Sequence, residues 1–261
     1  MFVSATEIQN NFGKYLKLCR VDTIVITKNG KKRAVLQQYP GNWEDGDVGE
    51  PSHIYGTNPE KEYAGPAGRP SAYITYQQFQ ELSEVSEHRY ERIDGIIYLQ
   101  ASPSFTHQKI VMAINDVFRA YFNTHEHCDA FAAPLDIELI RQPIRLKRDV
   151  DADDINIVQP DIVVLCDYQD YIDEKDRYRG TPTLVVEVLS PSTSGRDRIR
   201  KLSLYLESGI GEYWIVDPSG KKITVFAFRD FDLLSEQEFS SGSQASSYMF
   251  PGLETCVDRL F

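Results

Sequence analysis

Two acidic residues lie where buried strands are expected, and their spacing suggests a metal site. Asp161 follows Gln159-Pro160 at the start of the apolar run IVVLC, and Glu187 interrupts the apolar run TLVVEVL. A buried carboxylate without a partner is costly or becomes protonated. If the two strands are neighbours, the carboxylates converge and repel each other unless a cation lies between them. Mg²⁺ suits such a pair, because it binds one or two carboxylates and keeps positions for water and phosphate oxygens.

The segment that follows Glu187 supplies a basic residue for the same site. GRDRIRKLSLYLES predicts a helix that ends at Gly209, and Asp197, Lys201 and Tyr205 share one of its faces because they are spaced by four residues. An ammonium beside the cation could orient a water molecule or offset negative charge during phosphoryl transfer. The competing interpretation is a structural salt bridge between Glu187 and either Lys201 or an arginine.

The spacing of apolar residues from 72 to 261 predicts a mixed α/β domain with a central sheet flanked by helices. The expected strand segments are YERIDGIIYL, which turns at Asp94-Gly95, and PLDIELI, VQPDIVVLC, TLVVEVL and EYWIVD; the expected helices follow Thr75 and Ser104 and precede Gly209. VQPDIVVLC and TLVVEVL are almost entirely apolar, as strands covered on both faces are. His107, near the start of the second helix and on its apolar side, is either a packed, hydrogen-bonded histidine or a neighbour of the active site.

The N-terminal segment predicts a separate small unit with the order β-α-β-β over residues 1–39. A helical spacing of apolar residues follows Ser4, and two β-rich runs meet at Asn29-Gly30, a pair that favours a hairpin. A unit of this size buries little surface alone, so we expect it to pair with a second copy in a homodimer. Residues 40–71, rich in glycine, proline and acidic residues, are predicted to link it to the domain formed by residues 72–261.

Charge is distributed unevenly between these parts. Residues 1–39 contain seven basic and two acidic residues, a net charge of +5, whereas the chain of 261 residues has a net charge of −11, which leaves −16 for the rest. A basic segment attached to an acidic body suggests that the segment contacts a polyanion.

The composition is that of a globular protein, with 41% hydrophobic and 26% charged residues. No apolar run approaches the roughly 18 residues of a membrane span, so no membrane association is expected. The start, MFVSATEIQNN, lacks the pattern of a signal peptide. Four cysteines lie far apart without a C-x-x-C pair, which predicts buried free thiols in a reducing, cytoplasmic setting. They are Cys19, Cys128, Cys166 and Cys256.

The motifs ERIDGIIYLQASPSFTH, VQPDIVVLCD, TPTLVVEVLSPST and RDRIRKLSLYLESGIGEYWIVDP, in this order, resemble the Uma-type restriction endonucleases of the PD-(D/E)XK nuclease superfamily. The resemblance implies a restriction-endonuclease-like fold that hydrolyses phosphodiester bonds of DNA, with Mg²⁺ or Mn²⁺ bound by Asp161 and Glu187. The superfamily places a lysine two positions after the second acid, where this chain has Leu189; in the Uma-type group the following helix supplies it, which corresponds to Lys201. Glu91 corresponds to a further acid that the superfamily often adds.

The segments VSATEIQNNFGKYL and TIVITKNGKKRAVL resemble the Phd/YefM (prevent-host-death) antitoxin family. This resemblance implies a dimerising unit that binds DNA. Lys14 and Lys17, opposite the apolar side of the expected helix, and Arg33 are then candidate phosphate contacts. The run Lys31-Lys32-Arg33 can equally be a solvated hairpin.

A second class of function is compatible with the same sequence. An acidic body opposes DNA binding, which depends on neutralising phosphates. The nuclease fold can therefore also serve as a scaffold or partner-binding module of a non-catalytic DNA-binding regulator.

Overall fold

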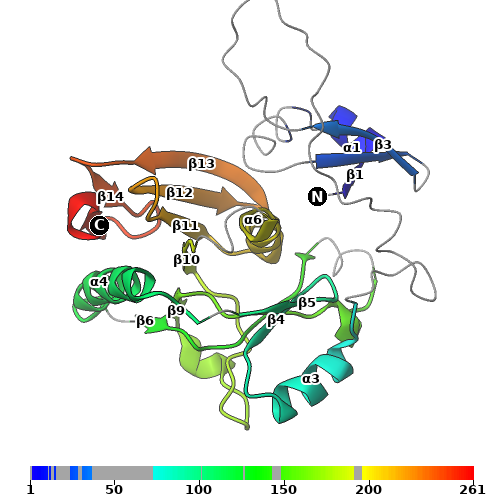
Figure 1. Ribbon diagram of the computed structural model, residues 1–261, viewed down its shortest axis with the longest axis horizontal. Coiled ribbons are helices and arrows are strands. Elements are labelled where there is room, and N and C mark those ends of the chain that lie inside the picture. The colour runs from blue at the N-terminus through cyan, green and yellow to red at the C-terminus, as the bar shows by residue number, and fades with distance from the viewer. Residues whose placement is uncertain are drawn as a thin grey trace, which may run out of the picture. The chain divides into compact units, whose positions relative to one another are not determined.

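The computed structural model describes residues 2–10, 12, 15, 24–28, 31–36, 73–100, 102–125, 127–142, 148–190 and 196–261. The chain divides into two compact units, Met1–Thr75 and Tyr76–Phe261 (Figure 1). The predicted linker, residues 40–71, lies outside the described residues, as do Lys14 and Lys17. In the described part of the chain, no helix has both the length and the apolar composition of a membrane span.

The N-terminal unit has the expected order of elements. These are β1 (Phe2–Ser4), α1 (Ala5–Asn10), β2 (Ile24–Lys28) and β3 (Lys31–Leu36). Strand β2 pairs in parallel with β1 and antiparallel with β3, where Lys28 lies opposite Lys31. The hydroxyl of Ser4 accepts a hydrogen bond from the backbone N–H of Glu7 at 3.0 Å, so the chain turns into α1 through a serine cap.

The larger unit is built on a mixed six-stranded sheet with the strand order β13-β12-β11-β10-β9-β6 (Figure 1). Its strands are β6 (Cys128–Ala132), β9 (Ile162–Cys166), β10 (Leu184–Val188), β11 (Glu212–Asp217), β12 (Lys222–Arg229) and β13 (Asp232–Phe239). Strands β10 and β11 are parallel and joined by helix α6 (Arg196–Ser208), and the other pairs are antiparallel. The predicted mixed central sheet is confirmed.

A second, four-stranded sheet has the order β5-β4-β8-β7. Its strands are β4 (Tyr90–Ile93), β5 (Ile96–Leu99), β7 (Ile137–Leu139) and β8 (Asn156–Val158). The predicted turn between β4 and β5 is confirmed, since Asp94 and Gly95 have φ values of 52° and 76°. The remaining elements are α3 (Tyr76–Val85), α4 (Phe105–Phe122), β14 (Gln244–Ser246), β15 (Glu254–Cys256) and the 3₁₀ helices Ala152–Asp154, Tyr168–Tyr171 and Val257–Arg259.

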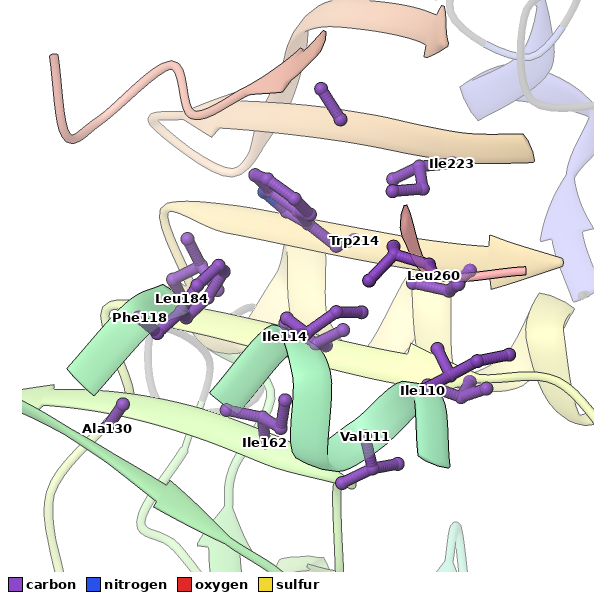
Figure 2. Packing of buried hydrophobic residues seen from close by; sticks show 14 of the residues in the cluster. Ile110, Val111, Ile114, Phe118, Ala130, Ile162, Leu184, Trp214, Ile223 and Leu260 are labelled. Atoms are coloured by element: carbon purple, nitrogen blue, oxygen red, sulfur yellow. The ribbon is translucent and has the colours of Figure 1, made fainter. Parts of the chain in front are cut away.

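Helices α4 and α6 cover opposite faces of the six-stranded sheet. Successive residues of a strand point to opposite faces. On β11, Trp214 meets Phe118 of α4 with ring centroids 5.4 Å apart, whereas its neighbour Tyr213 meets Tyr205 of α6 at 4.9 Å. The apolar residues of α4 pack with Ile162, Leu184 and other residues of the first face in one buried cluster (Figure 2).

A serine cap sets the start of α4. Ser104 has extended backbone angles, and its hydroxyl accepts a hydrogen bond from the backbone N–H of His107 at 3.2 Å. Replacing Ser104 with Ala should destabilise the protein by about 1 kcal/mol, because the first turn of the helix loses this acceptor. Urea unfolding measures the effect, with the exposed loop residue Ser102→Ala as a control expected to change stability by less than about 0.5 kcal/mol. Equal stabilities of the two variants would contradict the cap.

The prediction of free cysteines is wrong for two of the four. Cys128 and Cys166 form a disulfide, although they are 38 residues apart in the sequence. The cause is the register of the sheet: β6 pairs antiparallel with β9, and Cys128 lies directly opposite Cys166. Cys256 is free, and Cys19 lies outside the described residues.

Candidate active site

The register of the central sheet brings Asp161 and Glu187 together. Strands β9 and β10 are antiparallel, with Val186 opposite Ile162. The next pair in this register is Glu187 opposite Asp161, which lies one residue before β9. Val186 and Val188 belong to the buried cluster beneath α4, so Glu187, which alternates with them, points to the face that α6 covers.

Glu91 reaches the same place from the smaller sheet. It lies on β4 with a side chain only 3% exposed, and one of its oxygens, Oε1, accepts a hydrogen bond from the backbone N–H of Gln159 at 2.8 Å. Strand β4 pairs with β8, and the chain passes from β8 through Gln159 and Pro160 to Asp161. This short connection between the two sheets therefore holds Glu91 near the two acids of the central sheet.

Lys201 of α6 lies between two of these carboxylates. Its Nζ is 2.8 Å from Oε1 of Glu91 and 2.8 Å from Oε1 of Glu187, and the lysine is buried. One turn further along α6, the hydroxyl of Tyr205 donates to the same oxygen of Glu187 at 2.8 Å. The spacing of four residues between Lys201 and Tyr205 thus places both on the face of α6 that covers Glu187, as the sequence predicts.

Asp161 has different partners. Its Oδ2 accepts a hydrogen bond from the backbone N–H of Val188 at 2.8 Å and lies 3.2 Å from Nε2 of His107 on α4. His107 is therefore a packed histidine that contacts Asp161, one of the predicted site residues. Together these side chains form what we call the cluster, which consists of Glu91, Asp161, Glu187, Lys201 and His107.

The cluster carries an excess of negative charge. Burial raises the pKa of Glu187 to about 7; Lys201 acts in the opposite direction, and the charges of Asp161 and Glu91 add to the rise. Burial lowers the pKa of Lys201, but the charges of Glu187 and Glu91 outweigh it, and the pKa is raised, so the ammonium stays charged. With a pKa of about 7, raised chiefly by burial, Glu187 is partly protonated near neutral pH.

The cluster is accessible from outside. A cavity of about 290 Å³ is lined by Glu91, Asp161, Glu187, Lys201 and His107. Its wall also carries polar side chains from the β5–α4 connection and from neighbouring elements, namely Arg89, Gln100, Ser102, Ser104 and Gln108. A group bound in this cavity would meet acidic oxygens and the Lys201 ammonium at the same time.

The donor atoms suit a hard divalent cation at a site with few protein ligands. Within the described ranges, no group of three or more His, Cys, Asp and Glu side chains is arranged to hold a metal ion. Among the described residues, the hydrogen bonds of Asp161 and Glu187 use Oδ2 and Oε1, which leaves Oδ1 and Oε2 as possible ligand atoms for a cation. Mg²⁺ accepts two carboxylates and takes its remaining ligands from water and phosphate. The residues present therefore fit such a cation.

The sequence prediction for this site was incomplete. The sequence assigns no role to Tyr205, although its spacing of four residues from Lys201 is a usable signal. Arg89 and Gln108 of the cavity wall carried no signal, because only the folded chain brings them to the cavity. The predicted DNA contacts lie apart from the cluster in sequence: Lys14, Lys17 and the side chain of Arg33, a residue on β3, fall outside the described residues.

Comparison with known proteins assigns the larger unit to a family. A solved structure described as a putative nuclease belonging to DUF820, from Anabaena variabilis, is 21% identical, with a TM-score of 0.54 over 72% of this chain and 97% of that chain. This likeness shows the restriction-endonuclease-like fold. An uncharacterized protein of Synechocystis, slr1290, is 25% identical over 162 residues, which cover 62% of this chain and 77% of the relative. Residues 76–258 match Uma2, and the chain therefore belongs to this family, which is described as putative restriction endonuclease.

Proposed function

We propose that this protein hydrolyses phosphodiester bonds of DNA, with Mg²⁺ or Mn²⁺ bound by Asp161 and Glu187. The observation that carries the proposal is the position of Lys201, which lies 2.8 Å from both Glu91 and Glu187 at the wall of a cavity that Asp161 also lines. Membership of the Uma2 family supports it. When bound, a divalent cation would polarise a phosphate oxygen and favour the attacking form of water.

The side chains of the cluster have separate tasks in this proposal. Lys201 has three N–H donors, and two of them donate to Glu91 and Glu187. The third is available to orient a water molecule or a phosphate oxygen in the cavity. Glu91 holds Lys201 and is itself fixed by the backbone N–H of Gln159. Tyr205 fixes Oε1 of Glu187, because its pKa is raised well above its ordinary value by burial and by Glu187, and it remains a donor.

The charge balance of the cluster supports the proposal that a cation binds before the phosphate. Glu91, Asp161 and Glu187 carry three negative charges when ionised, and Lys201 carries one positive charge. A phosphate group would be repelled by the net charge of this arrangement. Asp161 and Glu187 would hold the divalent cation, which would offset this excess and attract the phosphate.

The proposal is tested by incubating the purified full-length chain, stripped with EDTA, with supercoiled plasmid, linear duplex, single-stranded DNA and RNA. Cleavage that requires added Mg²⁺ or Mn²⁺ and stops with EDTA is the expected result. Binding of DNA without cleavage of any substrate at any metal concentration would favour the regulator instead. The four substrates also identify the nucleic acid, since the cluster itself does not distinguish DNA from RNA.

The N-terminal unit is proposed to bind DNA as part of a homodimer. Large apolar side chains that are exposed among its described residues include Phe2, Phe12 and Val35, with exposed fractions of 64%, 52% and 57%. Exposed apolar residues on so small a unit are consistent with burial against a second copy. The basic charge of residues 1–39 then supplies the attraction for DNA that the acidic remainder of the chain lacks.

Replacing Lys14, Lys17 and Arg33 together with Ala in the full chain should weaken DNA binding and flatten its salt dependence. Each lost phosphate contact reduces the slope of log affinity against log salt by about 0.9, so three contacts reduce it by about 2.7. Fluorescence anisotropy with a labelled duplex at several salt concentrations measures the slope. Neutralising Lys175, Arg177 and Arg229 in the larger unit provides a control with the same change in net charge. An equal change of slope in both variants would show that binding follows net charge alone.

A further inference from the structure

His107 connects the first turn of α4 to Asp161. Its backbone N–H donates to the capping hydroxyl of Ser104 at 3.2 Å, and its Nε2 lies 3.2 Å from Oδ2 of Asp161. The imidazole is only 11% exposed and lines the cavity. The helix cap thus fixes the backbone of the residue whose side chain reaches the carboxylate.

Two donors converge on one oxygen of Asp161. The backbone N–H of Val188, at the end of β10, reaches Oδ2 at 2.8 Å, and Nε2 of His107 approaches the same atom. A carboxylate with two donors on one oxygen cannot rotate without losing a hydrogen bond. Its other oxygen, Oδ1, is thereby held in one direction, as an oriented donor for a cation.

The second ring nitrogen of His107, Nδ1, indicates that the contact between Nε2 and Asp161 has a cost in stability. Nδ1 of His107 is buried and has no hydrogen-bond partner among the described residues. A buried polar atom without a partner costs roughly 1–3 kcal/mol. An apolar residue of similar size would avoid this cost, so packing alone does not account for a histidine at this position. The ring atom that contacts Asp161 is Nε2.

We propose that His107 is a positioning residue: its Nε2–H donates to Oδ2 of Asp161 and so orients Oδ1 toward the divalent cation. This inference rests on the proposed function, because it assumes that Asp161 binds the cation. Groups that orient metal ligands typically contribute 10–100-fold to metal affinity. His107 itself touches neither the cation nor the phosphate in this arrangement.

The test compares two replacements of His107 in the full chain. Gln can place its Nε2 amide donor near the position of the imidazole Nε2, whereas Leu has similar bulk and no donor. Calorimetric titration of EDTA-stripped protein with Mn²⁺ should show a Kd 10–100-fold higher for His107→Leu and within a few-fold of wild type for His107→Gln. His88→Leu, at an exposed position, is the matched control and should bind Mn²⁺ as wild type does. Thermal melts without metal establish that each variant is folded.

The outcomes separate this inference from the proposed function. Equal Mn²⁺ affinity of wild type and His107→Leu overturns it, as does an affinity of folded His107→Gln as low as that of His107→Leu. Absence of Mn²⁺ binding by the wild type overturns it together with the metal site. If the Mn²⁺ affinities are as expected but wild type does not cleave DNA, His107 still positions Asp161, and the proposed nuclease activity is overturned.

A measurement without metal tests the same contact if His107→Leu fails to fold. ¹⁵N–¹H correlation spectra of the neutral imidazole should show the proton of His107 on Nε2. Asp161→Asn should shift this resonance, and His88 should be unaffected. A proton on Nδ1 would overturn the inference, because Nε2 could not then donate.

Discussion

Replacing Lys201 with Ala is expected to lower the proposed rate of DNA cleavage by roughly 10²-fold or more, the scale expected for one well-placed electrostatic or proton-transfer group. The physical reason is the loss of the ammonium that lies 2.8 Å from both Glu91 and Glu187. Metal affinity should not fall, because removing a positive charge from an acidic cluster favours a divalent cation. Single-turnover cleavage at saturating Mn²⁺, together with Mn²⁺ titration, measures the two effects separately.

The same replacement should also destabilise the protein without metal. Removing one partner of a buried ion pair costs about 3–5 kcal/mol, since the remaining charges are left uncompensated. Lys222→Ala is a matched control, because Lys222 contacts Glu238 at 2.7 Å on the surface, where such pairs contribute about 0–1 kcal/mol. A folded Lys201→Ala protein with normal cleavage at saturating metal would show that the lysine is only structural.

Replacing Glu187 with Gln raises the melting temperature of the metal-free protein at pH 8. Glutamine keeps the shape and can still accept from Lys201 and Tyr205, while Glu91 continues to balance the ammonium. The change removes one negative charge, which the negative charges of Asp161 and Glu91 repel. A gain of about 1 kcal/mol is expected for repulsion at a high effective dielectric constant. For a domain of this size, that gain corresponds to about 2–4 °C.

The pH dependence of this gain has a definite sign. The pKa of Glu187 is raised from 4.5 to about 7, so folding favours the protonated carboxyl. Protonated Glu187 stabilises the folded state. This stabilisation is fully present at pH values below 4.5, the pKa of the group in the unfolded chain, and is lost as the pH rises through about 7. Wild type should therefore approach Glu187→Gln in melting temperature as the pH falls from 8 to about 5. A lower melting temperature for Glu187→Gln at pH 8 would mean that the charge of Glu187 serves a structural salt bridge.

Bound metal should reverse the order of the melting temperatures of wild type and Glu187→Gln. A ligand at 100 times its Kd stabilises the folded state by about 2.7 kcal/mol, and wild type should gain this amount with Mn²⁺. Glu187→Gln should lose most of the gain, because one of its two charged ligands is neutral. Equal responses of both proteins to Mn²⁺ would place the cation elsewhere.

The sequence predicted the two strands that carry the central acids because both are nearly continuous apolar runs in which a carboxylate is conspicuous. It also predicted the face of α6 that meets them, since Lys201 and Tyr205 are four residues apart. The convergence of Asp161 and Glu187 was conditional on the pairing of β9 with β10, a register that the structure provides. Local patterns therefore indicated which residue each element contributes, whereas the pairing of the two strands came from the structure.

Contacts that depend on long-range register were not predictable. Glu91 comes from a different sheet and meets Lys201 across 110 residues of sequence, so the pattern YERIDG alone could not distinguish a solvated hairpin from a site. The disulfide between Cys128 and Cys166 has the same origin, because it depends on which residues of β6 and β9 are opposite. His107 could be placed on the apolar side of its helix, but its partner Asp161 lies 54 positions further along the chain.

The most direct test of the account is the rate of plasmid cleavage by Glu187→Gln beside wild type, at equal concentrations of folded protein and saturating Mn²⁺. The substitution preserves the shape of the site and removes one charge from the proposed metal ligand. We expect metal-dependent cleavage by wild type and a rate at least about 10²-fold lower for Glu187→Gln. Equal cleavage rates would contradict it, because Glu187 would then have no part in the reaction.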